Sequence, residues 1–185
     1  MPNYEYTDKG SVRMQNIQSY WKQDKEYVAV VADLLENELL QELDTITHHH
    51  YTTRLNHSIF VSYVSYSIAK KFNLNYRSVA RAGLLHDFFI EGREDIKQLK
   101  KGSHNYVHPK LALENAKKIT EINDIEEDII LKHMFLCTRC TFPKFKESFI
   151  VTFVDKYCAI NEVSHPTREK VAIAFATLKL KLKLA

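Results

Sequence analysis

The chain has 185 residues, of which 45% are hydrophobic, and this is enough for one domain with a buried core. Only 4 glycines and 4 prolines interrupt it, so the composition disfavours a β-sandwich, a β-barrel or a disordered chain. The 26 basic and 23 acidic side chains leave a net charge of +3, too small an excess to indicate nucleic acid as a partner. We therefore expect an all-α domain, and the charge is compatible with a small anionic substrate.

The sequence carries no signal for a membrane or for export. No apolar stretch approaches the roughly 20 residues that span a bilayer, and the first residues lack the basic and then apolar order of a signal peptide. These features predict a cytoplasmic protein with no membrane partner, whose 3 cysteines are reduced.

The first half of the chain predicts three helical segments. Residues 1–13 are polar and form an expected N-terminal arm, after which apolar residues recur at helical spacing from 14 to about 43. Asp24 is a plausible cap or break inside this stretch, and residues 45–53 are expected to be a connector. Further helices are predicted from 54 to 72 and, capped by Asn75, from 76 to about 88.

The second half alternates loops and helices. Residues 91–106 predict a loop with room for a short helical piece, and Pro109 fits the first turn of a helix that ends near 119. Asn123 or Asp124 caps the next helix, a loop follows over 136–145, and 147–162 is a strongly apolar helix. Pro166 opens the last helix, and residues 178–185 form a Leu-Lys tail, so we expect one helical domain over 14–177 with about seven to nine helices.

His86-Asp87 is the first candidate site, because it follows the apolar run Ala82-Gly83-Leu84-Leu85. Two adjacent ionisable groups at the end of a core helix are costly unless they are paired or bound to a metal. Neighbours on a helix point about 100° apart, so the two side chains can reach one ion from different directions. The alternative for this pair alone is a buried His-Asp hydrogen bond.

Four more residues of ligand type lie in or beside apolar helical segments. They are His57, His108, His133 and Asp155. Taken singly, each is explained as a core polar residue with a hydrogen-bond partner, but the six together favour a metal site.

The order His57, His86-Asp87, His108, His133, Asp155 resembles the ligand order of HD-domain metal phosphohydrolases. It is similar to the version with two additional histidines, which holds a binuclear site, and the resemblance covers roughly residues 52–162. The segments that carry it are Asn56-His57-Ser58, Ala82-Gly83-Leu84-Leu85-His86-Asp87-Phe88-Phe89, His108-Pro109-Lys110-Leu111-Ala112 and Val154-Asp155-Lys156-Tyr157. It implies an all-α HD-domain bundle.

The resemblance also implies roles for individual residues. The first metal would be held by His57, His86, Asp87 and Asp155, and Asp87 would bridge to a second metal held by His108 and His133. Mixed imidazole and carboxylate ligands favour Fe or Mn, are compatible with Zn, Co and Ni, and match Mg less well. A metal-activated water would attack phosphorus in a phosphate ester or anhydride, with a nucleotide as one candidate substrate.

Further residues are candidates for contacting the substrate. Lys156, next to a ligand, could contact a phosphate during catalysis, although a solvated lysine explains it as well. Arg54 could bind phosphate and His49 could line the pocket, although surface and connector roles are the plainer interpretations. His104, four residues before His108, could also face the substrate and is the reserve ligand in place of His108.

Two other functions stay open at this point. One is a di-iron HD-type oxygenase with the same six ligands, and the other is a non-enzymatic regulator that binds metal or nucleotide. Cys137-Thr138-Arg139-Cys140 suggests a zinc or redox site, but a structural zinc needs four ligands, and the remaining cysteine lies in a predicted core helix.

Overall fold

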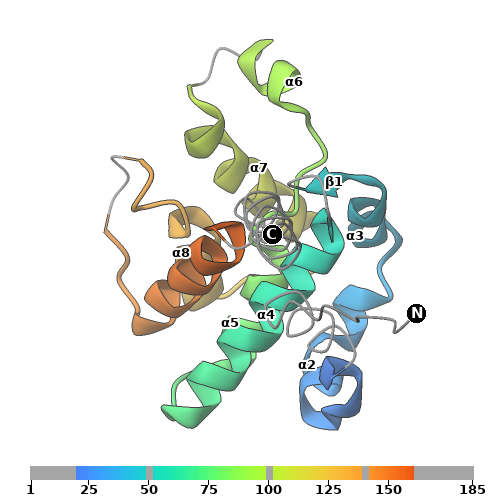
Figure 1. The fold of residues 1–185 in the computed structure, drawn as a ribbon, viewed down its shortest axis with the longest axis vertical. Helices are drawn as coiled ribbons and strands as arrows, with labels where there is room; N and C mark the ends of the chain where they lie inside the picture. Colours follow the sequence, from blue (N-terminus) through green and yellow to red (C-terminus); the bar gives the residue numbers. More distant parts are fainter. Residues whose placement is uncertain (1–19, 49–51, 99–101, 139–141, 161–185) are drawn as a thin grey trace, which may run out of the picture.

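The computed structural model describes residues 20–48, 52–98, 102–138 and 142–160, and this part of the chain is an all-α fold (Figure 1). Residues 146–160 are helical as well and lead to the end of the described part. The other elements are η1 (Trp21–Gln23), α2 (Lys25–Leu35), α3 (Glu38–Gln41), η2 (Glu42–Thr45), β1 (Thr47–His48), β2 (Thr52–Thr53), α4 (Arg54–Lys71), α5 (Tyr76–Leu85), α6 (Arg93–Gln98), α7 (His104–Ile119) and α8 (Asp124–Lys132).

Several sequence-based predictions fall outside the described residues. They are the N-terminal arm 1–13, the helix that Pro166 opens, the Leu-Lys tail 178–185 and His49. None of the helices that the structure describes has the length and apolar character needed to cross a bilayer.

Within the helical stretch predicted from 14 to about 43, the expected cap or break at Asp24 is confirmed, and a second break at Asn37 was not predicted. The Asp24 carboxylate accepts a hydrogen bond from the Tyr27 amide at 3.0 Å and begins α2. The Asn37 side chain accepts from the amides of Leu39 and Leu40 and begins α3. A side-chain acceptor that satisfies the first amides of a helix also fixes where that helix begins. The expected connector at 45–53 contains a minimal antiparallel ladder, in which Thr47 pairs with Thr53.

Helix α4 is central, and α5 crosses it closely. A Cβ atom placed on Gly83 of α5 would lie 2.8 Å from the Ser62 Cα of α4, so only glycine allows this approach. The Ser62 hydroxyl donates to the Ala80 carbonyl at 2.6 Å and accepts from the Tyr27 hydroxyl at 2.8 Å. These bonds join α2, α4 and α5 through buried groups and set the spacing of the two helices that carry His57 and His86.

Two predicted helix ends near the site are displaced. Helix α7 begins at His104 rather than at Pro109, so His108 lies inside the helix and not at its start. Pro109 has no amide hydrogen, so the carbonyl of Asn105 lacks its usual helical donor. This loss is confined to the first turn of the helix. Helix α5 ends at Leu85, and His86 and Asp87 occupy the turn that follows.

The helical segment 146–160 is joined to α8 by a buried carboxylate. Asp128 of α8 accepts hydrogen bonds from the Ser148 hydroxyl at 2.7 Å and from the Lys144 amide at 2.9 Å. It also forms an ion pair with Lys132. These contacts hold the segment that presents Asp155 against the helix that precedes His133.

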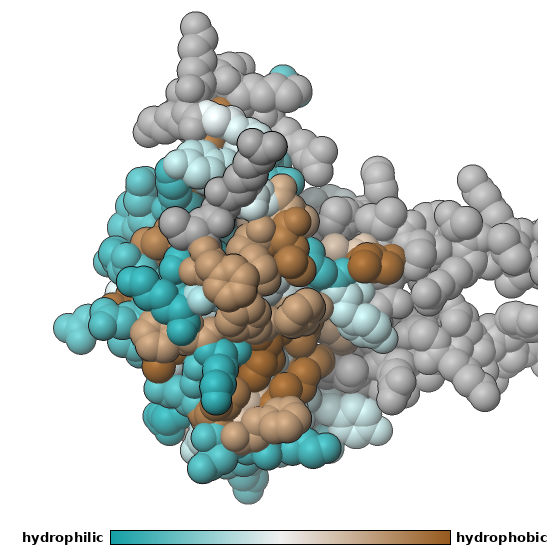
Figure 2. All heavy atoms as spheres, turned by 90° about the vertical axis from the view of Figure 1, so that its left-hand side faces the viewer, coloured by the Kyte–Doolittle hydropathy of each residue, from teal (hydrophilic) through white to brown (hydrophobic). Residues whose placement is uncertain are grey.

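One face of the molecule carries an apolar patch. Figure 2 shows hydrophobic side chains gathered on the side that carries α8 and residues 146–160. Phe142 and Phe153 are 70% and 58% exposed, and the ring of Phe142 packs on Phe135 and Phe149.

Asn123 begins α8 with a reciprocal cap, which can be tested by mutation. Its side chain accepts from the Ile125 and Glu126 amides at 3.0 Å, and the Glu126 carboxylate accepts from the Asn123 amide at 3.0 Å. Replacing Asn123 by alanine is expected to lower the free energy of unfolding by about 1 kcal/mol, measured by chemical denaturation. Asn123→Asp keeps the acceptor and should lose less; equal losses would show that the cap is not the cause.

Candidate metal centre

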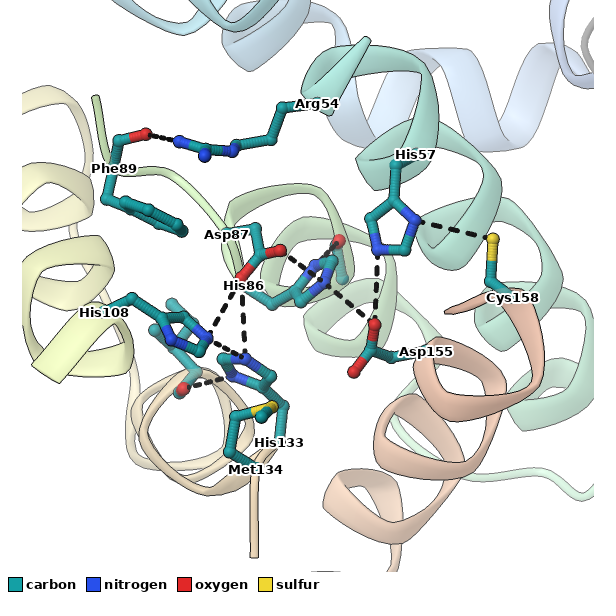
Figure 3. A network of polar contacts seen from close by, with 12 residues as sticks. Arg54, His57, His86, Asp87, Phe89, His108, His133, Met134, Asp155 and Cys158 are labelled. Atoms are coloured by element: carbon teal, nitrogen blue, oxygen red, sulfur yellow. Dashed lines mark hydrogen bonds and ion pairs between the residues drawn. The ribbon is translucent and has the colours of Figure 1, made fainter. Parts of the chain in front are cut away.

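The six predicted ligand side chains converge on one buried place from five segments of the chain (Figure 3). His57 comes from α4, His86 and Asp87 from the turn after α5, and His108 from α7. His133 follows α8, and Asp155 lies on the helical segment 146–160. All six are buried, with between 0% and 7% of each residue exposed.

The ligand atoms divide into two groups of three. One group is His57, His86 and Asp155, and the other is Asp87, His108 and His133. Within each group the atoms lie within 4.8 Å of one another, so two imidazoles and one carboxylate could hold an ion in each. Asp87 faces both, because its Oδ1 atom is 3.3 Å from His108 Nε2 and its Oδ2 atom is 3.8 Å from His86 Nε2.

Three of the four imidazoles are oriented by backbone carbonyls of their own helices. His86 Nδ1 lies 2.8 Å from the Gly83 carbonyl, and His133 Nδ1 lies 2.8 Å from the Ile130 carbonyl. His108 Nδ1 lies 2.9 Å from the His104 carbonyl. Since a carbonyl only accepts, the ring proton belongs on Nδ1 in each case, and each Nε2 directs a lone pair into the site.

The contact between His108 and His133 is explained better by a cation than by a hydrogen bond between two neutral rings that both carry the proton on Nδ1. Their Nε2 atoms are 2.9 Å apart, and two neutral rings that both carry the proton on Nδ1 would set two lone pairs against each other. Two nitrogens each about 2.1 Å from one ion and at about a right angle lie about 3 Å apart, which matches this spacing. The pair therefore fits a metal ion better than it fits a hydrogen bond.

Two of the predicted ligand atoms are among the buried side-chain atoms that have no hydrogen-bond partner in the described part of the chain. They are His86 Nε2 and Asp87 Oδ1, and each faces the opposite kind of group at ion-pair distance. Buried polar atoms without partners are rare, and an ion in this place would satisfy both. The residues thus fit metal ions on the chemistry and the spacing of their donor atoms.

Electrostatics favour the forms that bind metal. Burial acts to raise the pKa of Asp87. The opposing electrostatic effect of the His86, His108 and His133 rings is larger, so that pKa lies below its ordinary value. Burial likewise opposes a low pKa at Asp155, and the contacts with the His57 and His86 rings outweigh it, so that pKa also lies below its ordinary value. Burial lowers the pKa of His133 to about 3 and also lowers that of His108. Ionised carboxylates and neutral imidazoles are the forms in which these side chains coordinate ions.

A pocket of about 810 Å³ opens onto the two groups. Asp87, His108, His133 and Asp155 line it together with Arg54, Lys156 and His104, so the predicted substrate-contacting residues within the described part all border it. His104 belongs to neither ligand group, and the structure gives it another place: its carbonyl orients His108, and its ring packs edge-on against the Phe89 ring.

Arg54 is a buried arginine with no carboxylate at ion-pair distance in the described part of the chain, although Asp87 and Glu91 attract it from farther away. Only 9% of the residue is exposed, its guanidinium lies 3.8 Å from the centre of the Phe89 ring, and Nη1 donates to the Phe89 carbonyl. Its Nε is buried and makes no hydrogen bond. Lys156 is held differently, because Nζ lies 2.7 Å from Asp155 Oδ2 and 2.8 Å from Met134 Sδ.

Two residues of the site were missed by the sequence analysis. Phe89 supports Arg54, and Cys158 places its sulfur 3.4 Å from His57 Nδ1. The available signals were the position of Phe89 two residues after Asp87 and of Cys158 three residues after Asp155 on one helix.

Comparison of the chain with protein-family models, with curated proteins and with solved structures finds no match. No similar protein indicates a function for the site, so only the chemistry of its own side chains does.

Proposed function

We propose that this protein is a metal-dependent phosphohydrolase of the HD type, which uses two divalent transition-metal ions to hydrolyse a phosphate ester or anhydride. The observation that carries the proposal is the meeting of two buried groups, each with two imidazoles and a carboxylate, at Asp87. Three protein ligands per ion leave coordination positions for water and substrate, as in catalytic sites. When bound, such ions acidify a water molecule and offset negative charge on phosphoryl oxygens.

The cationic side chains around the pocket support an anionic substrate. A buried guanidinium with no carboxylate at ion-pair distance is costly, and an anionic ligand in the pocket would offset that cost. Arg54 would bind the phosphate through its planar donors, while Phe89 holds the guanidinium in place. Lys156, fixed by Asp155 and Met134, would supply a second positive charge at the pocket wall. A nucleotide is a candidate substrate.

The proposal can be tested on full-length protein prepared without a histidine tag. Elemental analysis after reconstitution with Mn²⁺ or Fe²⁺ is expected to find about two ions per chain, one for each group. The loaded protein should release phosphate or nucleoside from a panel of phosphomonoesters, phosphodiesters and nucleotides, and the metal-free protein should not. Metal binding without any hydrolysis, together with tight nucleotide binding, would instead support a regulator.

A second candidate function is favoured by one observation. Two histidines and one carboxylate per ion are also the donor set of non-haem iron sites that activate oxygen. In that case the iron-loaded protein would consume oxygen when its substrate is added, and Mn²⁺ would not replace iron. Hydrolysis under anaerobic conditions with Mn²⁺ separates the phosphohydrolase from this alternative.

Arg54 offers a direct test of substrate binding. Arg54→Gln is expected to raise KM for a phosphate substrate about tenfold to a hundredfold, because a hydrogen bond to a charged group contributes about 1.5–3 kcal/mol. Arg54→Lys keeps the charge but loses the planar fork, so its KM should lie between those of the two proteins. The matched control is Arg77→Gln, an exposed arginine on α5, which should leave KM unchanged. If Arg54→Gln and Arg77→Gln raise KM equally, the net charge of the protein and not a contact with Arg54 explains the effect.

A further inference from the structure

His57 is the one ligand imidazole whose Nδ1 faces a side chain. The corresponding atoms of His86, His108 and His133 lie against backbone carbonyls. His57 Nδ1 instead lies 3.4 Å from Cys158 Sγ, and only 1% of each residue is exposed (Figure 3). His57 therefore differs from the other three candidate ligand imidazoles in the partner of its Nδ1 atom.

Both ring nitrogens of His57 contact side chains from a single turn of the helical segment 146–160. Asp155 and Cys158 are three residues apart on the helical segment 146–160 and so lie on one face of it. The carboxylate is 3.2 Å from Nε2 and the thiol is 3.4 Å from Nδ1. The orientation of the ring thus depends on two neighbouring side chains of a helix distant in sequence.

These two contacts have different consequences for the ring proton. An ionised carboxylate only accepts, so without metal the proton of a neutral ring belongs on Nε2, and Nδ1 then accepts a hydrogen bond from the thiol. A metal ion at Nε2 needs that lone pair, so the proton must then lie on Nδ1, which would donate to the sulfur. A thiol can serve as donor or acceptor, whereas a carbonyl can only accept.

We propose that Cys158 is a positioning residue that supports His57 in either tautomer, and that His57 changes tautomer when the first group binds metal. The inference rests on the proposed metal centre. During the change Nε2 gives its proton to solvent, Nδ1 takes one from solvent, the thiol rotates, and the ring charge is unchanged. The rings of His86, His108 and His133 need no such change, because their carbonyl partners keep the proton on Nδ1.

Nitrogen NMR of histidine-labelled protein reads the tautomers directly, and the His57→Gln spectrum assigns the His57 signals. In metal-free protein His57 should carry its proton on Nε2, while His86, His108 and His133 carry theirs on Nδ1. Adding Zn²⁺, a diamagnetic probe, should move the His57 proton to Nδ1. A His57 ring protonated on Nδ1, or on both nitrogens, in the metal-free protein would overturn the proposal.

Two variants separate hydrogen bonding from packing at Cys158. Competition with a chelator should show that Cys158→Val binds one of its two zinc ions at least about tenfold more weakly than the wild type, the effect expected when a partner of a ligand is lost. Cys158→Ser keeps a donor and acceptor, so its affinities should stay within about threefold of the wild type. Equal affinities in Cys158→Val and the wild type, or equal weakening in both variants, would assign Cys158 to packing alone and overturn the proposal.

Failure of the metal centre itself would be seen separately. If the wild type bound no zinc, the proposed function would fail, while the tautomer of His57 in metal-free protein would still decide the part assigned to Cys158. Thermal melting of each metal-free variant serves as the control for folding.

Discussion

Replacing Asp87 by alanine is expected to reduce the bound metal from about two ions per chain to one or fewer and to abolish hydrolysis. Asp87 is the only carboxylate of the group with His108 and His133, and its other oxygen faces His86 of the first group. Two imidazoles without a charged ligand hold a divalent ion weakly, and the remaining ion loses a nearby negative charge. Since a catalytic metal contributes several kcal/mol, kcat/KM should fall about a thousandfold or more.

Elemental analysis and phosphate release measure the two effects of this substitution on the same samples. Asp124→Asn, at an exposed carboxylate on the first residue of α8, is the matched control and should keep both the metal and the activity. Comparison of melting temperatures without metal checks that the Asp87 variant folds. Full metal content in Asp87→Ala would show that Asp87 is not a ligand and that the two groups are not joined through it.

Replacing Gly83 by alanine is expected to destabilise the protein by about 3 kcal/mol, the upper range for overpacking in a dense core. The new Cβ would lie 2.8 Å from the Ser62 Cα and 3.3 Å from its amide nitrogen, and backbone atoms cannot rotate away. Helices α4 and α5 must therefore move apart. Because the Gly83 carbonyl orients His86, the shift should also weaken metal binding. Chemical denaturation of metal-free protein and chelator competition measure the two effects.

Gly92→Ala is the matched control for the Gly83 substitution. A Cβ at Gly92 would meet the Asp95 side chain at 3.1 Å, and this exposed carboxylate can turn aside. We expect its effect on stability to stay within about 0.5 kcal/mol, as for most surface substitutions. Similar losses in both variants would mean that general glycine flexibility, and not the contact between α4 and α5, is responsible.

The helices could be predicted where local chemistry decides them. Asp24, Asn75 and Asn123 each accept hydrogen bonds from the first amides of a helix, and this property is visible in the sequence. The start of α7 could not be placed, because Pro109 suits a first turn but is also tolerated inside this helix once His104 begins it. The break at Asn37 was missed because the apolar spacing continues across it.

The sequence predicted which residues could act as ligands in the site, but not the contacts that these residues make with their neighbours. The six candidate ligand residues stand out in the sequence because ionisable groups are rare in apolar helices. The contact between Arg54 and Phe89 joins residues 35 positions apart, and that between His57 and Cys158 joins residues 101 positions apart. Such contacts depend on how helices cross and how rings turn, neither of which follows from the spacing of apolar residues.

The carbonyls that orient His86 and His133 belong to the last turns of α5 and α8, where backbone acceptors lose their helical donors. At the end of each helix, one hydrogen bond therefore satisfies a terminal carbonyl and also orients the ring of a candidate ligand. In the proposed metal centre, fraying of either helix end would accompany release of an ion, so bound metal should slow amide exchange in the last turns of α5 and α8 more than in the middle of α4. Substitutions that loosen these helix ends, without replacing any candidate ligand, would then raise the metal concentration that the protein needs for activity.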